Sequence, residues 1–154
     1  MKKLFLIFVL ISSLVAEESV KKVVFDLTTG DPKVFEKKIL SGIVHQKGHY
    51  ESKLQELGVA IVIHGDAYKF FVKNLKNTEY KNDKALLKKQ KEYEQRLSSL
   101  VETYEVAIYM CEVGRKAHKL DKKDIYEFVD YVPNSTIGLI DQQNDGAAYV
   151  PIAK

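Results

Sequence analysis

Short apolar runs rich in β-branched residues alternate along the chain with longer stretches in which apolar residues recur every three or four positions. The runs predict strands, because a strand that is buried on both faces reads as a continuous apolar segment, and the periodic stretches predict helices. The predicted strands are Lys22–Leu27, Gly58–His64, Val106–Cys111, Thr136–Asp141 and Ala147–Val150. The predicted helices cover residues 32–50, 67–75 and 83–101, a short segment that opens after Cys111, and residues 121–129.

The order of these elements favours an α/β fold. Strands that alternate with helical segments build a doubly wound, mostly parallel sheet, here of about five strands in a single domain. In such a sheet, the loops that follow the strands meet at one edge, where open α/β proteins place their sites. The loops predicted there cover residues 28–31, 64–67 and 111–115.

The N-terminal residues have the pattern of a signal peptide. Lys2 and Lys3 form a charged start, an apolar run follows from Leu4 to Ile11, and the sequence before residue 17 offers cleavage after Ala16. The run is too short to span a bilayer comfortably, although an uncleaved anchor is the alternative interpretation. We therefore expect residues 1–16 to be removed, residues 17–154 to form the mature domain without stable membrane insertion, and the protein to be periplasmic.

The net charge and the motifs missing from the sequence disfavour several classes of function. Loss of Lys2 and Lys3 with the leader lowers the formal net charge from +3 to +1, which gives no general reason to expect a nucleic-acid partner. The sequence contains no Gly-rich phosphate loop, CxxC, HExxH or GxSxG motif. We therefore expect neither a metal nor an organic cofactor.

Cys111 is the only cysteine, so the chain cannot form an internal disulfide. It ends a predicted strand and precedes a predicted helix, where backbone N–H groups and the helix dipole favour the thiolate. A reactive thiol, a buried packing residue and a redox-sensing disulfide between two chains are all compatible with this position.

Three further residues are candidates for the same site. His64 ends the second predicted strand, so its imidazole is a candidate proton partner for Cys111, or else a strand-end histidine bonded to a loop. Gly114 and Arg115 lie in the turn after Cys111 and are candidate contacts for negative charge on sulfur. Glu112 would oppose that charge, and Arg115 could offset it.

Taken in order, several segments resemble the DsrE/DsrF-like family of sulfur-relay type. They are Val23–Asp26, Val62–Gly65, Ala107–Cys111, Val132–Thr136 and Gln143–Tyr149, and together they span nearly all of residues 17–154. The resemblance implies a flavodoxin-like subunit that assembles into homotrimers or homohexamers. It also implies that the cysteine at position 111 accepts sulfur as a persulfide and passes it on.

The leading hypothesis is therefore a periplasmic sulfur carrier or sulfurtransferase that exchanges sulfane sulfur with a donor or acceptor protein or with a small sulfur compound. The alternative is a non-catalytic, oligomeric DsrE-like module that binds a small ligand or anion, in which Cys111 is structural.

Overall fold

A five-stranded parallel sheet forms the centre of the molecule in the computed structural model, which describes residues 20–153. The strands are β1 (Lys21–Leu27), β2 (Leu57–Ile63), β3 (Val106–Cys111), β4 (Asp130–Val132) and β5 (Ala148–Ile152). They lie in the order β4-β3-β2-β1-β5, and every neighbouring pair is parallel. The predicted α/β class is confirmed, and the sheet is parallel throughout.

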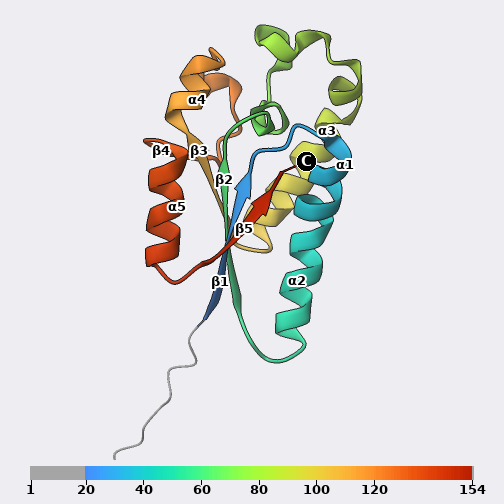
Figure 1. The fold of residues 1–154 in the computed structure, drawn as a ribbon. Coiled ribbons are helices and arrows are strands. Elements are labelled where there is room, and N and C mark those ends of the chain that lie inside the picture. The colour runs from blue at the N-terminus through green and yellow to red at the C-terminus, as the bar shows by residue number, and fades with distance from the viewer. Residues whose placement is uncertain (1–19, 154) are drawn as a thin grey trace, which may run out of the picture.

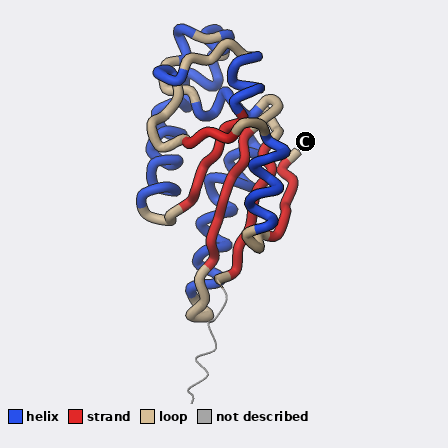
Figure 2. The backbone as a smooth tube through the Cα atoms, turned by 90° about the vertical axis from the view of Figure 1, so that its left-hand side faces the viewer, coloured by secondary structure: helices blue, strands red, loops and turns tan. Residues whose placement is uncertain are grey.

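Helices cover both faces of this sheet (Figure 1). On one side the chain forms α1 (Pro32–Val34), a π-helical segment (Phe35–Ser41), α2 (Gly42–Glu51) and α3 (Lys84–Glu102). On the other side lies α5 (Ser135–Asn144), and α4 (Glu112–Ala117) stands above the end of β3. Figure 2 shows the same arrangement from the side, with the strands between helical layers.

The strand order reverses direction at β1. The chain adds β2, β3 and β4 in turn on one side of β1, and β5 then returns to its other side. Connections between parallel strands are right-handed, so a connection that runs the other way along the sheet must cross its other face. The helix α5, which connects β4 to β5, accordingly packs on the face opposite α2 and α3. The reversal places the carboxyl ends of β5, β1 and β2 together, which is where open α/β sheets bind ligands.

The larger hydrophobic core lies between the sheet and α2 and α3. Phe35 and Phe70 stack there with their ring centroids 4.1 Å apart. Tyr93 from α3 packs against Phe35 in a T-shaped arrangement, with the ring centroids 5.4 Å apart. A smaller core of Val24, Ala60, Val62 and Ala147 faces α5. The continuous apolar runs that predicted β1, β2 and β3 are therefore buried from both sides.

The predicted strand over residues 136–141 is wrong, because this segment lies within α5. The side-chain oxygen of Asn134 caps the helix by accepting a hydrogen bond from the N–H of Ile137 at 2.9 Å. The more buried positions of α5 then follow a helical period: Ser135, Gly138, Leu139 and Gln142. The β-branched residues in this segment led to the strand prediction, whereas the Asn134 cap favours the helix that the structure shows.

The predicted helix over residues 121–129 is also wrong. Only Lys122–Asp124 forms a short 3-10 turn, and the chain then extends into β4. Besides its short local turns, the backbone here bonds to a distant segment: the N–H of Lys73 donates to Asp124 and the N–H of Tyr126 donates to Phe71. The predicted helix over residues 67–75 is likewise a 3-10 helix, Ala67–Phe71, followed by two further 3-10 turns, Leu75–Asn77 and Glu79–Asn82.

Within residues 20–153, none of the helices combines the length and apolar character needed to cross a bilayer. The predicted signal peptide, residues 1–16, lies outside the described residues.

Candidate functional site

Cys111 lies at the carboxyl end of β3 and serves as the N-cap of α4. Its sulfur accepts a hydrogen bond from the N–H of Gly114 at 3.5 Å, and the residue is only 5% exposed. The N–H of Ser135, at the start of α5, also hydrogen-bonds the sulfur. The amino ends of two helices therefore converge on one thiol, as the strand-to-helix pattern of the sequence predicted for α4 alone.

These contacts control the ionisation of the thiol. Burial raises the pKa of Cys111, but hydrogen bonds from Gly114, Tyr68, Ser135 and Val113 together outweigh burial and leave the pKa below its ordinary value. Each of these hydrogen bonds favours the charged form of the sulfur. The site therefore stabilises the thiolate, which is the nucleophilic form of cysteine.

Tyr68 approaches Cys111 from the 3-10 helix that follows β2. Its hydroxyl donates a hydrogen bond to the Cys111 carbonyl oxygen at 3.0 Å and also reaches the sulfur. The Tyr68 side chain is fully buried, and burial is the main reason why its own pKa lies well above the usual range. Tyr68 therefore stays protonated and can act only as a hydrogen-bond donor to a charged sulfur.

Arg115 of α4 is occupied by contacts with α4 itself, the segment after it and β4. The guanidinium pairs with the Glu112 carboxylate at 2.6 Å, donates to the carbonyl of Leu120, and lies over the Tyr131 ring at 5.9 Å. A hydrogen bond from Lys122 is the largest cause of the lowered pKa of Glu112, and Arg115 adds to it. The Glu112 charge beside the thiol is thus paired with two cations.

His64 is held by a buried carboxylate. Its Nε2 lies 2.5 Å from one oxygen of Asp26 on β1, and the hydroxyl of Tyr149 on β5 donates to the other oxygen at 2.7 Å. Gly65, which has a φ of +62°, allows the sharp turn directly after His64, because a side chain there would meet the Thr28 carbonyl at 2.9 Å. Among the described residues, no hydrogen bond joins His64 to Cys111.

Asp26, Tyr149 and Tyr68 were not identified from the sequence. Asp26 carries a usable signal, because a lone acid within the apolar run Val23–Leu27 must find a partner when the strand is buried. The two tyrosines carry no such signal, since each joins the site through the fold and not through its sequence neighbours.

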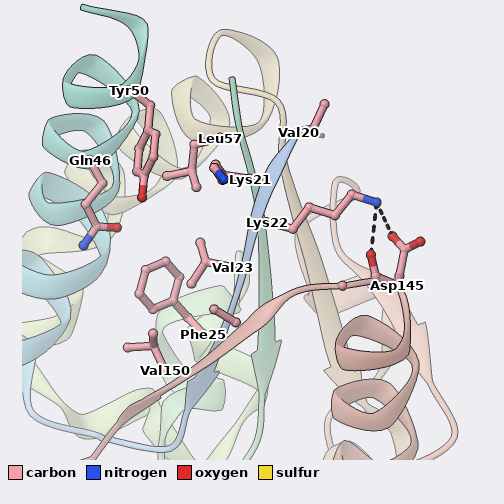
Figure 3. A pocket seen from close by; sticks show the side chains of 12 residues that line it. Val20, Lys21, Lys22, Val23, Phe25, Gln46, Tyr50, Leu57, Asp145 and Val150 are labelled. Carbon is pink, nitrogen blue, oxygen red and sulfur yellow. Dashed lines mark hydrogen bonds and ion pairs between the residues drawn. The ribbon is translucent and has the colours of Figure 1, made fainter. Parts of the chain in front are cut away.

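A large cleft lies away from Cys111, at the opposite end of the sheet. It has a volume of about 1000 Å³ and lies between α2, the first half of β1, and β5. Figure 3 shows Gln46 and Tyr50 of α2 facing Val23 and Phe25, with a Lys22–Asp145 ion pair at the side. A second cleft of about 750 Å³ lies at the carboxyl edge, where His118 bonds Glu79 at 2.6 Å.

A metal ion would need several side chains in the described part of the chain that together could bind it. Within residues 20–153, no group of three or more His, Cys, Asp or Glu side chains is arranged to hold a metal ion. The carboxyl edge carries a stabilised thiolate, a hydrogen-bonded imidazole and backbone N–H donors.

Comparison with known proteins agrees with this fold. A protein of unknown function, MTH1491 from Methanobacterium thermoautotrophicum, has a solved structure that matches with a TM-score of 0.60 at 20% sequence identity. The match covers 85% of this chain and 98% of that chain.

An uncharacterized protein of Aquifex aeolicus (strain VF5) is 32% identical over 159 residues, an alignment that covers 98% of this chain. The chain spans 64% of the length of that relative. A model of the DsrE/DsrF-like family matches residues 22–152, which include every strand except the first residue of β1. The chain therefore belongs to the DsrE/DsrF-like family.

Proposed function

We propose that this protein handles sulfur in the periplasm and carries sulfane sulfur as a persulfide on Cys111. The observation that carries the proposal is the set of hydrogen bonds that stabilise a thiolate on the single cysteine, at the carboxyl edge of the sheet. Membership of a family with sulfur-relay members supports the same chemistry.

The transfer proceeds by two displacements at sulfur. The Cys111 thiolate attacks the outer sulfur of a donor such as a polysulfide or thiosulfate, the donor's sulfur–sulfur bond breaks, and the donor leaves as a shorter polysulfide or as sulfite. An acceptor then attacks the outer sulfur of the persulfide, and Cys111 leaves as the thiolate. No external oxidant or reductant is consumed.

The surrounding groups have defined parts in this proposal. The N–H of Gly114 holds negative charge on sulfur. His64 is the proton partner of Cys111. Arg115 contributes through its ion pair with Glu112, which limits the repulsion between that carboxylate and the thiolate. We expect a homotrimer or homohexamer and a donor or acceptor that is a protein or a small sulfur compound.

A second candidate is favoured by one observation, the 5% exposure of Cys111. In this alternative the protein is a non-catalytic, oligomeric module that binds a small ligand or anion, and the cysteine is a packing residue. The two candidates differ in whether the native thiol reacts.

Intact-mass spectrometry decides between them. The mature protein is incubated with polysulfide or thiosulfate and weighed beside Cys111→Ser. We expect a gain of one sulfur atom that reductant reverses and that the variant lacks. A native protein that gains no sulfur, and whose thiol labels only after unfolding, would leave the binding module as the function. The mass of the protein purified from the periplasm also locates the cleavage site.

A further inference from the structure

Asp26 on β1, His64 directly after β2 and Tyr149 on β5 form one hydrogen-bonded chain across three neighbouring strands. An ionised carboxylate can only accept hydrogen bonds. The Nε2 atom of His64 therefore carries the proton that Asp26 accepts, and Tyr149 donates its own proton to the second oxygen. This assignment leaves a lone pair on Nδ1 of His64, which has no hydrogen-bond partner among residues 20–153.

The strand register brings His64 next to Cys111. Ile63 of β2 pairs with Met110 of β3; His64 directly follows β2, and Cys111 is the last residue of β3. Because side chains alternate between the faces of a sheet, His64 and Cys111 continue the rows of Val62 and Tyr109, which belong to the core on the α5 side. Neighbouring strands lie about 4.8 Å apart. The side chains of His64 and Cys111 therefore lie at neighbouring positions on one face of the sheet, although each is hydrogen-bonded to other groups.

The three side chains differ in their access to solvent. The Asp26 side chain is 12% exposed and the His64 side chain 29% exposed, whereas Tyr149 as a whole residue is 45% exposed. The carboxylate is thus shielded and committed to its two partners, while the imidazole can meet a molecule that arrives from solvent. A shielded carboxylate that orients an accessible imidazole is the arrangement that general bases require.

We propose that Asp26, His64 and Tyr149 form a triad in which His64 is the general base for the thiol that accepts sulfur from Cys111. Asp26 and Tyr149 are positioning residues that hold the imidazole in one tautomer and one orientation. This inference rests on the proposed persulfide function, and it adds a proton-transfer device to that site.

The step balances in protons and electrons. Nδ1 of His64 takes the proton from the acceptor R–SH, and the resulting R–S⁻ attacks the outer sulfur of the Cys111 persulfide. The bond between that sulfur and Sγ breaks, its electron pair leaves with the Cys111 thiolate, and the acceptor departs as R–S–S⁻. The imidazolium then loses its proton to solvent.

The test compares two acceptors, because only one of them needs a base. The protein is loaded with polysulfide, freed of excess reagent, and mixed at neutral pH with reduced glutathione or with inorganic sulfite. Glutathione must lose a thiol proton before it attacks, whereas sulfite attacks through a lone pair on sulfur. Loss of the added sulfur is followed by intact mass in a single turnover.

We expect Asp26→Asn and His64→Gln to slow transfer to glutathione by about tenfold or more, in line with the contribution of general bases, and to leave transfer to sulfite unchanged. Tyr149→Phe, at an exposed position, gives a smaller decrease with glutathione and keeps the test valid if the Asp26 variant does not fold. His45→Gln on α2 is the control and changes neither rate.

Equal rates in all variants, or equal losses with both acceptors, would overturn the triad while the persulfide function stands. A wild-type protein that takes up no sulfur would overturn both proposals, and the loading step alone reveals that outcome.

Discussion

The Tyr68 hydroxyl fills the space that a side chain at position 114 would need. A Cβ built on Gly114 would lie 1.9 Å from Oη of Tyr68 and 2.6 Å from Cζ. The absence of that carbon lets the buried hydroxyl reach the backbone and sulfur of Cys111. The glycine in α4 and the tyrosine in the 3-10 helix after β2 are thus one structural unit.

Gly114→Ala should therefore destabilise the protein. The Tyr68 ring is fully buried and cannot move aside without disturbing the core, so we expect a loss of about 1–3 kcal/mol in the free energy of unfolding, typical of overpacking. Urea denaturation of the variant measures this loss. The matched control is Gly48→Ala in α2, where an added Cβ meets nothing within 4 Å and better helix propensity should stabilise the protein slightly. Destabilisation of similar size in both variants would contradict the prediction.

Tyr68→Phe should raise the pKa of the Cys111 thiol. The variant keeps the ring in the core but removes an O–H that hydrogen-bonds the charged sulfur, so the thiolate loses support and forms at higher pH. The rate of alkylation by iodoacetamide, measured against pH, reports the shift. Tyr80→Phe is the control, because the Tyr80 hydroxyl contacts His118 at 3.4 Å. A pH profile that is the same in wild type and in both variants would show that Tyr68 acts only through packing.

The parts of the fold that the sequence predicted are those that continuous apolar runs determine. The observed β1, β2 and β3 agree with the predicted strands to within one residue, and α3 agrees with the periodic stretch over residues 83–101. Cys111 stands at the end of β3 and at the start of a helix, as predicted. Burial of a central strand from both sides leaves a signal that needs no tertiary context.

The rest depended on contacts that join distant segments. Residues 121–129 resemble a helix in their apolar spacing, but the backbone of Asp124 and Tyr126 bonds to residues 71–74. Asp26 and Tyr149 lie 123 positions apart in the sequence, and they meet only because β5 returns beside β1. The sequence predicts where a site can form, but the partners of each side chain there follow from the strand order.

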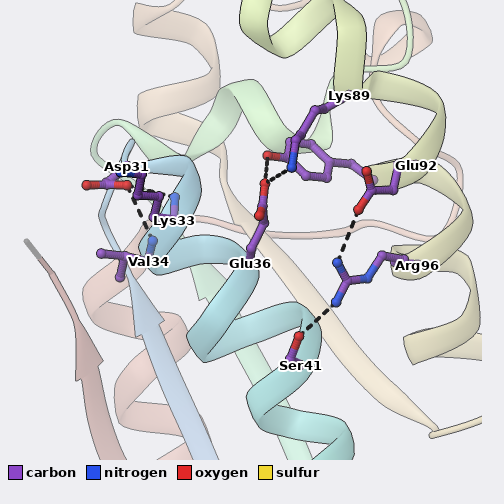
Figure 4. A network of polar contacts seen from close by, with 9 residues as sticks. Asp31, Lys33, Val34, Glu36, Ser41, Lys89, Glu92 and Arg96 are labelled. Atoms are coloured by element: carbon purple, nitrogen blue, oxygen red, sulfur yellow. Dashed lines mark hydrogen bonds and ion pairs between the residues drawn. The ribbon is translucent and has the colours of Figure 1, made fainter.

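Glu36 links the helical layer on one face of the sheet, and its charge should contribute to stability. Its carboxylate accepts from Lys89 at 2.6 Å and from the Tyr93 hydroxyl at 2.7 Å (Figure 4). The hydrogen bond from Lys89 is the largest cause of the lowered pKa of Glu36, and that from Tyr93 is the next. A lowered folded-state pKa stabilises the protein above the unfolded-state pKa, and this contribution is lost as the pH falls through the folded-state pKa.

Glu36→Gln should therefore cost about 1 kcal/mol at neutral pH, a value limited by solvent screening of the partly exposed carboxylate, and should flatten the decline in stability toward acid pH. Thermal unfolding between neutral and acid pH measures both effects. Glu92→Gln is the control, because its pair with Arg96 is longer, at 3.3 Å, and lies on the surface (Figure 4). A difference between wild type and Glu36→Gln that stays constant with pH would contradict the ionic contribution.

The Asn134 cap connects the stability of α5 to the reactivity of Cys111. The Asn134 side chain fixes the first turn of α5, and the N–H of Ser135 in that turn hydrogen-bonds the sulfur. Asn134→Ala should cost about 1 kcal/mol of stability, as loss of an N-cap does. Because the first turn then frays, the thiolate loses one donor and the pKa of Cys111 should rise.

Unfolding in urea and the pH profile of alkylation measure these two effects separately. Asp83→Ala is the matched control, since Asp83 caps α3 through the N–H of Leu86 at 2.9 Å and has no contact with the thiol. It should lose a similar amount of stability without a change in the pKa of Cys111. If both variants leave that pKa unaltered, α5 does not support the thiolate, and the charge on sulfur is stabilised by α4 and Tyr68 alone.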